Sequence, residues 1–279
     1  MFREFGQSSR SMLHIIYELL VRVGDMNLRI LGCSGGIGGE LRTTSLMIDD
    51  DILIDAGTGI GELSLSEMGE LRHIFLTHSH LDHIANLPLL IDSIFEKIKY
   101  PITVHAQPAT IKALKEHVFN WVIWPDFSCL PNEENPVMLF SEMTPGKLVS
   151  IGDREFEMIP VNHSVPSVGF YVRQGENAFA FSGDTTTNDT FWAGLNLRKK
   201  LDMLIIEVAF PNSQLALSKA AFHYCPSLLA EDIVKLEHSP KIYISHPKPG
   251  QEKKIADELK AYGVCDGFIC LQGNECFAV

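Results

Sequence analysis

The sequence lacks several features that would place it in other classes of protein. Its six cysteines are scattered without a CxxC pair and no secretory signal precedes them, which is typical of reduced thiols in the cytosol. The longest apolar stretch, residues 12–23, is interrupted by His14, Glu18 and Arg22 and is too short to span a bilayer. We therefore expect a cytoplasmic protein without a membrane partner.

Positive charge is also scarce. The chain has 23 Lys and Arg against 35 Asp and Glu, a formal net charge of -12, which disfavours a large nucleic acid or an anionic membrane surface as partner. The glycine-rich stretch 32–39 is not followed by Gly-Lys-Ser/Thr, which argues against a phosphate-binding P-loop. A small anion remains possible, because bound metal ions can outweigh the global field.

What the chain does contain is an ordinary globular composition, with 46% hydrophobic and 21% charged residues in 279 positions. Residues 1–25 are predicted to be an N-terminal extension, and residues 26–279 a single domain without internal repeats or low-complexity linkers. Strand-like runs alternate with helical segments such as 87–95, 108–119 and 226–237. This alternation predicts an α/β sandwich with its polar loops along one edge.

The most informative segment is residues 75–84, which read Phe-Leu-Thr-His-Ser-His-Leu-Asp-His-Ile. Three histidines and one aspartate fall within positions 78–83, directly after an apolar strand, where α/β proteins place their chemistry. His78 and His80 are two residues apart and can chelate one ion, and Asp82 and His83 suit a second. The alternative is a chance cluster of surface histidines, which would leave the strand end poorly packed.

Three later strands also end on a possible ligand. These ligands are His163, Asp184 and His246, each at or just after the end of an apolar run. Together with the cluster at 78–83 they provide seven nitrogen or oxygen ligands, enough for two ions if Asp184 bridges them.

The order HxHxDH, His, Asp, His resembles the metallo-β-lactamase superfamily, and within it the class II cyclic-nucleotide phosphodiesterases. Four stretches carry the resemblance, which covers roughly residues 27–268: His78-Ser-His-Leu-Asp-His-Ile, the aromatic segment 120–127, Phe222-His-Tyr-Cys-Pro-Ser-Leu-Leu and His246-Pro-Lys-Pro. The resemblance implies the αββα four-layer fold of that superfamily. It also implies a small-molecule cyclic nucleotide as substrate, cyclic AMP and also cyclic GMP, and a homodimer.

Carried over position by position, the resemblance implies a dinuclear site. His78, His80 and His163 would hold one metal, Asp82, His83 and His246 the other, and Asp184 would bridge. The cofactors would be two divalent ions, zinc first, with manganese or iron as alternatives. A hydroxide between such ions is a nucleophile at neutral pH and would open the cyclic phosphodiester to a 5′-monophosphate. As a ligand of the second metal, Asp82 is predicted to be a catalytic residue as well.

The sequence also predicts roles for residues outside the ligand set. His223, just before a helix start, is a candidate proton donor to the leaving 3′-oxygen, and Glu207 a candidate to orient it. Trp121, Trp124 and Phe127 are candidates to stack on the base, although aromatic residues at these spacings are as often core or dimer contacts.

Two other functions stay open at the level of sequence. One is ribonuclease Z-like processing of tRNA, against which the charge of -12 argues. The other is a non-catalytic di-iron sensor or binding module on the same fold, since the ligand set tolerates iron.

Overall fold

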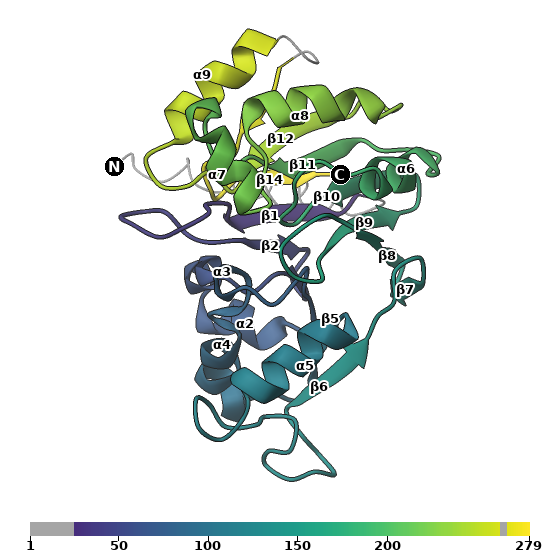
Figure 1. The fold of residues 1–279 in the computed structure, drawn as a ribbon. Helices are drawn as coiled ribbons and strands as arrows, with labels where there is room; N and C mark the ends of the chain where they lie inside the picture. The colour runs from purple at the N-terminus through teal and green to yellow at the C-terminus, as the bar shows by residue number, and fades with distance from the viewer. Residues whose placement is uncertain (1–24, 263–266) are drawn as a thin grey trace, which may run out of the picture.

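Two seven-stranded sheets lie face to face in the computed structural model, which describes residues 25–262 and 267–279 (Figure 1). The first sheet pairs the two ends of the described chain, because β14 lies antiparallel to β1. Its strands, in spatial order, are β14 (Cys276–Ala278), β1 (Asn27–Gly32), β2 (Ser45–Ile48), β3 (Ile52–Ile54), β4 (His73–Phe75), β5 (Ile102–Ala106) and β6 (Met138–Glu142).

The second sheet is antiparallel at one side and parallel at the other. Strands β7 to β10 pair antiparallel, whereas β10, β11, β12 and β13 pair in parallel. Its strands, in spatial order, are β13 (Ile269–Cys270), β12 (Lys241–Ser245), β11 (Met203–Glu207), β10 (Asn177–Phe181), β9 (Val168–Gln174), β8 (Arg154–Pro160) and β7 (Leu148–Ile151).

Helices cover the outer face of each sheet (Figure 1). The α-helices on the first sheet are α2 (Leu65–Glu70), α3 (Leu81–Ile84), α4 (Leu87–Ile94) and α5 (Pro108–His117). Those on the side of the second sheet are α6 (Thr190–Asn196), α7 (Leu215–Ala220), α8 (Pro226–Asp232) and α9 (Glu252–Tyr262). The described residues also form the short 3₁₀ turns η1 (Thr58–Glu62), η2 (Phe95–Lys97), η3 (Asn212–Gln214) and η4 (Ile233–Lys235).

The layers follow from the two-residue period of the strands. In β3, Ile52 and Ile54 face the second sheet and join the central core, whereas Leu53 faces the helices. In β11, Ile205 points to the central core and Leu204 to the outer one. Both faces of these strands are buried, which explains why their sequences are continuous apolar runs. The predicted αββα sandwich is confirmed.

The predicted elements match the observed ones with local differences. The helix expected over 226–237 is α-helical only to Asp232 and continues as the 3₁₀ turn η4, because apolar periodicity does not separate the two helix types over a single turn. Of the predicted extension, residues 1–24 lie outside the described part of the chain, so that boundary stays a prediction. Among the described helices, none is both long and apolar enough to cross a membrane.

Candidate metal centre

The predicted ligands come from four separate segments that meet at one edge of the two sheets, and Asp82 and His83 lie within the short helix α3. His78 and His80 follow β4, with His80 at the N-cap of the short helix α3, and His163 follows β8. Asp184 follows β10, and His246 follows β12 with a left-handed backbone at φ 66°. Because each ligand stands where a strand has ended, the sheets fix the positions of the loop ends.

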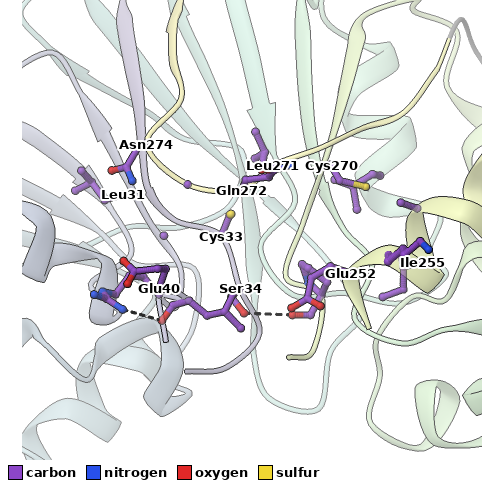
Figure 2. A pocket seen from close by; sticks show the side chains of 18 of the residues that line it. Leu31, Cys33, Ser34, Glu40, Glu252, Ile255, Cys270, Leu271, Gln272 and Asn274 are labelled. Atoms are coloured by element: carbon purple, nitrogen blue, oxygen red, sulfur yellow. Dashed lines mark hydrogen bonds between the residues drawn. The ribbon is translucent and has the colours of Figure 1, made fainter. Parts of the chain in front are cut away.

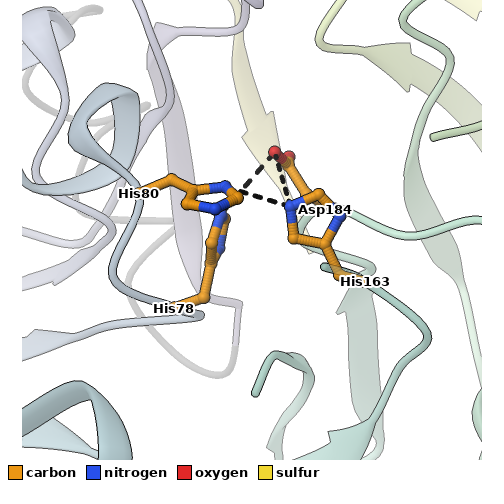
Figure 3. A group of neighbouring side chains, drawn as sticks. All are labelled: His78, His80, His163 and Asp184. Carbon is orange, nitrogen blue, oxygen red and sulfur yellow. Dashed lines mark hydrogen bonds and ion pairs between the residues drawn. The ribbon is translucent and has the colours of Figure 1, made fainter. Parts of the chain in front are cut away.

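Three histidines, His78, His80 and His163, gather beside Asp184, as Figure 3 shows. Nε2 of His78 lies 3.7 Å from Asp184 Oδ2 and Nε2 of His163 lies 3.9 Å from it. His80 joins them through Nδ1, which is 3.1 Å from His163 Nε2. The four side chains can therefore offer one ligand atom each to a single ion.

The other oxygen of Asp184 faces a second group. Nε2 of His83 lies 3.2 Å from Asp184 Oδ1, and Nδ1 of His246 lies 3.4 Å from the same oxygen. Asp82 completes the group, with Oδ2 3.7 Å from His246 Nε2. Asp184 is thus the one residue common to both groups, as a bridging carboxylate would be.

Hydrogen bonds behind the histidines set which ring nitrogen faces the centre. His83 Nδ1 lies 2.7 Å from Asp55 Oδ2, and His78 Nδ1 lies 3.0 Å from the hydroxyl of Thr77, which itself donates to Asp55. His163 Nδ1 donates to the carbonyl of Phe222 at 2.9 Å. With the proton on Nδ1, the lone pair of Nε2 points at Asp184, which is the tautomer a metal ligand needs.

The electrostatics of the centre favour neutral imidazoles at most positions. Burial lowers the pKa of His163 to about 4 and that of His246 to about 3, and it lowers the pKa of His78 well below its usual value. His83 differs, because Asp184 and Asp55 outweigh its burial and raise its pKa. Asp184 is buried, yet the facing histidines hold its pKa well below the usual range.

The donor set fits divalent cations. His78 Nε2 and His83 Nε2 are buried and make no hydrogen bond within the described structure, although both point at a carboxylate. Buried nitrogens without a partner are rare in proteins, since desolvation destabilises them. A cation held by these imidazoles and carboxylates would satisfy both, so nitrogen and oxygen donors of this kind suit zinc, manganese or iron.

Beside the two groups lies a buried acid and histidine pair. His223 Nδ1 is 2.6 Å from Glu207 Oε1, which also accepts from the backbone N–H of Thr185 at 2.9 Å. Burial opposes the charge on His223, but Glu207 outweighs it and raises the pKa of the imidazole. The ring of His223 stacks on that of His246, with centroids 5.3 Å apart. The pair therefore places Nε2 of His223 beside the candidate centre.

The aromatic segment is divided between core and surface. Phe127 is 2% exposed and packs against Phe95 and Phe119, so it has no ring face for a base and the stacking prediction does not hold for it. Trp124 is partly buried against the same core. Trp121 is 62% exposed, with a left-handed backbone at φ 63° and its N–H bonded to the carbonyl of Trp124. Base stacking by Trp121 or Trp124 stays a prediction.

Sequence reasoning missed residues that surround the centre. Phe222 fixes His163 through its carbonyl and has φ 57°, a strained conformation for a non-glycine residue. Lys248 contacts His246, with Nζ 3.5 Å from Nε2. The left-handed backbone at Phe222 has no simple sequence signal. Lys248 lies within the His246-Pro-Lys-Pro stretch and could have been noted as a cation two residues after a ligand.

A large cavity of about 490 Å³ lies beside the loop that follows β1 (Figure 2). It is lined by Cys33, Ser34, Ile255 and Leu271 among others, and none of the seven predicted ligands is in its wall. The loop itself supports the metal centre, because Cys33 O accepts from His246 N at 2.6 Å. This cavity is therefore separate from the candidate centre.

Comparison with known proteins agrees with this fold. The family model of the beta-lactamase superfamily domain matches residues 50–246, which is more than half of the chain. The chain belongs to the beta-lactamase superfamily.

Within this superfamily the relatives have several names. A probable 3′,5′-cyclic-nucleotide phosphodiesterase of Yersinia pestis is 30% identical over 68% of this chain and 62% of its own length. A 3′,5′-cyclic-nucleotide phosphodiesterase of Aliivibrio fischeri is 26% identical over 80% of this chain and 78% of its own length. A ribonuclease Z of Methanococcus maripaludis is 30% identical over 53% of this chain and 49% of its own length. The match therefore spans less than two thirds of the Yersinia protein.

Solved structures confirm the superfamily fold. Unliganded yeast PDE1 superposes with a TM-score of 0.77 at 18% identity, over 92% of this chain and 100% of that one. At this identity the likeness concerns the fold alone.

Proposed function

We propose that this protein is a metal-dependent hydrolase that opens 3′,5′-cyclic nucleotides, cyclic AMP first and also cyclic GMP, to 5′-monophosphates. The observation that carries the proposal is the carboxylate of Asp184 between two groups of buried ligands, next to the hydrogen-bonded pair Glu207 and His223. The names of the Yersinia and Aliivibrio relatives support the substrate class.

The seven side chains named as ligands would hold two divalent ions, zinc first, with manganese or iron as alternatives. When bound, such ions supply an activated water and positive charge for the phosphoryl oxygens. The buried histidines keep lone pairs directed at Asp184, and Asp55 and Thr77 hold two of the rings in place. These residues thus orient the site before any substrate binds.

His223 would supply the proton that the leaving oxygen needs. Hydrolysis breaks the bond between phosphorus and the 3′-oxygen, phosphorus gains an oxygen from water, and the departing oxygen needs a proton. Glu207 accepts a hydrogen bond from Nδ1–H of His223 and leaves Nε2 free to face the substrate. A protonated imidazole there can donate to the leaving oxygen, a contribution of typically 10²–10⁴-fold in rate.

A ribonuclease Z-like activity is the second candidate, supported by the Methanococcus match over 53% of this chain. The net charge of -12 argues against it, because tRNA binding rests on Lys and Arg contacts to phosphates. Hydrolysis of a precursor tRNA in place of cyclic AMP would decide for this candidate. A redox-active di-iron site without hydrolysis of either would indicate a sensor.

The test is metal analysis together with assays on the purified protein. We expect about two metals per active chain, because two ions activate the water and clamp the phosphoryl group together. Asp184→Ala should lose metal and the hydrolysis of cyclic AMP. One metal per chain in a fully active sample, or full activity in Asp184→Ala, would contradict the two-metal proposal. The homodimer and the cytoplasmic location stay predictions, the first of which sedimentation can check.

A further inference from the structure

Lys248 is a cation at the metal centre that has no acidic partner. Its Nζ donates to the carbonyl of Gly35 at 2.9 Å and lies 3.5 Å from His246 Nε2. Within the described part of the chain, no carboxylate lies within ion-pair distance of it. Acidic side chains outnumber basic ones in this protein, so an unpaired half-buried ammonium at this place needs an explanation.

Its position is fixed by the backbone on two sides. The N–H of Lys248 donates to the carbonyl of Ala209 at 3.0 Å, and the carbonyl of Pro247 accepts from Gly35 N at 3.0 Å. The side chain is therefore held at both ends rather than free in solvent. The ammonium lies next to His246, whose ring stacks on that of His223 with centroids 5.3 Å apart.

The positive charges of Lys248 and of an ion bound at His246 would together favour an anion between them. A divalent ion bound at His246 and the ammonium of Lys248 would repel one another, and an anionic oxygen facing both would relieve that repulsion. A single ammonium binds phosphate as a point charge, with up to three rotatable donors. The contacts of Lys248 Nζ with Gly35 O and His246 Nε2 use two of its three donors, which leaves one for a ligand.

We propose that Lys248 binds a phosphoryl oxygen of the substrate and of the product. The assigned ligand class is a phosphate ester or free phosphate anion, held between Lys248 and the metal ligands on the side of His223. The inference deepens the proposed function and rests on it for the identity of the ester. The anion subsite itself rests on the unpaired ammonium and its place beside His246.

The test measures anion binding apart from turnover. Metal-loaded wild type, Lys248→Met and Lys248→Arg are titrated calorimetrically with inorganic phosphate and with 5′-AMP, after metal content has been measured. A charge-assisted hydrogen bond of this kind should make Lys248→Met bind both anions roughly ten- to hundredfold more weakly, with both metals retained. Lys248→Arg should recover part of the affinity. Lys253→Met, which removes an exposed charge on α9, is the matched control and should bind like wild type.

The outcomes separate the two proposals. Unchanged anion affinity in a fully metallated Lys248→Met would overturn the subsite, and loss of metal in that variant would show that Lys248 instead supports the loop of His246. Under the proposal, the Michaelis constant for cyclic AMP rises more than the turnover number falls. If wild type does not hydrolyse cyclic nucleotides but its phosphate affinity depends on Lys248, the substrate assignment fails while the subsite stands.

Discussion

Asp55 Oδ2 lies 2.7 Å from His83 Nδ1, and the other oxygen of this buried carboxylate accepts the backbone N–H of Thr77 at 2.8 Å. One side chain thus holds both the ring of a predicted ligand and the strand end that carries two others. Asp55 has φ 61°, a conformation that Asn and Asp tolerate better than most residues. The centre therefore depends on a residue that is not itself a ligand.

Asp55→Asn should keep the fold but weaken the second metal position. An amide has one acceptor oxygen where the carboxylate has two, so it cannot hold both His83 Nδ1 and Thr77 as before. Loss of such a partner typically lowers metal affinity 10- to 100-fold, which competition with a chelator can measure. Asp92→Asn, on the exposed side of α4, is the control. Equal affinity in both variants would show that Asp55 has only a structural role.

His223→Ala should retain both metals but lose on the order of 10²-fold in turnover on cyclic AMP. The loss should be smaller for bis(p-nitrophenyl) phosphate, whose leaving group is acidic and needs no proton. Glu207→Gln should also lower the turnover on cyclic AMP, but by a smaller factor, because the imidazole of His223 remains and loses only its anionic partner. Equal losses of His223→Ala on both substrates would indicate phosphate binding, and a loss of metal would place His223 among the ligands.

Gly35→Ala should disturb the centre although Gly35 is not a ligand. A Cβ at this position would lie 2.6 Å from the carbonyl oxygen of His246 and 2.9 Å from its ring, too close for either to stay in place. We expect lower metal content and lower activity, measured on the same preparation. Gly61→Ala is the matched control, because a Cβ there meets open space. Normal metal content in Gly35→Ala would show that the His246 loop can shift without releasing the ion.

Alanine substitutions of Phe127 and Trp121 in the aromatic segment should affect stability differently. Phe127→Ala removes a core ring and should destabilise the fold by about 3–5 kcal/mol, measured by urea unfolding. Trp121→Ala removes an exposed ring and should change stability by about 0.5 kcal/mol or less. If Trp121 stacks on a base, its loss should raise the Michaelis constant for cyclic AMP but not for bis(p-nitrophenyl) phosphate. Unchanged kinetics on both substrates would remove Trp121 from the substrate site.

A partly buried histidine pair away from the centre should make stability depend on pH. His105 Nε2 lies 3.0 Å from His73 Nδ1, and burial, assisted by His73, lowers the pKa of His105 from 6.5 to about 4. Between those pH values the unfolded chain binds a proton that the folded protein does not, so stability falls as the pH falls through this window. The effect is on the order of 3 kcal/mol at most.

The comparison is made with His105→Gln, which keeps a polar group beside His73 but does not titrate. Its free energy of unfolding should fall less steeply between pH 6.5 and 4 than that of wild type. Parallel curves for the two proteins would mean that His105 titrates normally in the fold.

The sequence by itself is enough to predict the types of the candidate ligands and most of the fold. The ligands at 78–83 are a local motif, and His163, Asp184 and His246 follow apolar runs whose ends a sheet must bring to one edge. Central strands such as β3 and β11 are predictable because burial on both faces makes them continuous apolar runs. The short strand β14 was not predicted. Its pairing with β1 joins opposite ends of the described chain, and no local sequence pattern indicates such a pairing.

The contacts between particular atoms follow from the tertiary structure. The division of the two Asp184 oxygens between two histidine groups, the burial of Phe127 and the contact of Lys248 with His246 all depend on how loops from both sheets pack. Side-chain direction is set by backbone conformations such as the left-handed φ of Asp55, Phe222 and His246, which no sequence period encodes. Residue types follow from local chemistry, whereas their distances and orientations follow from the packing of distant segments.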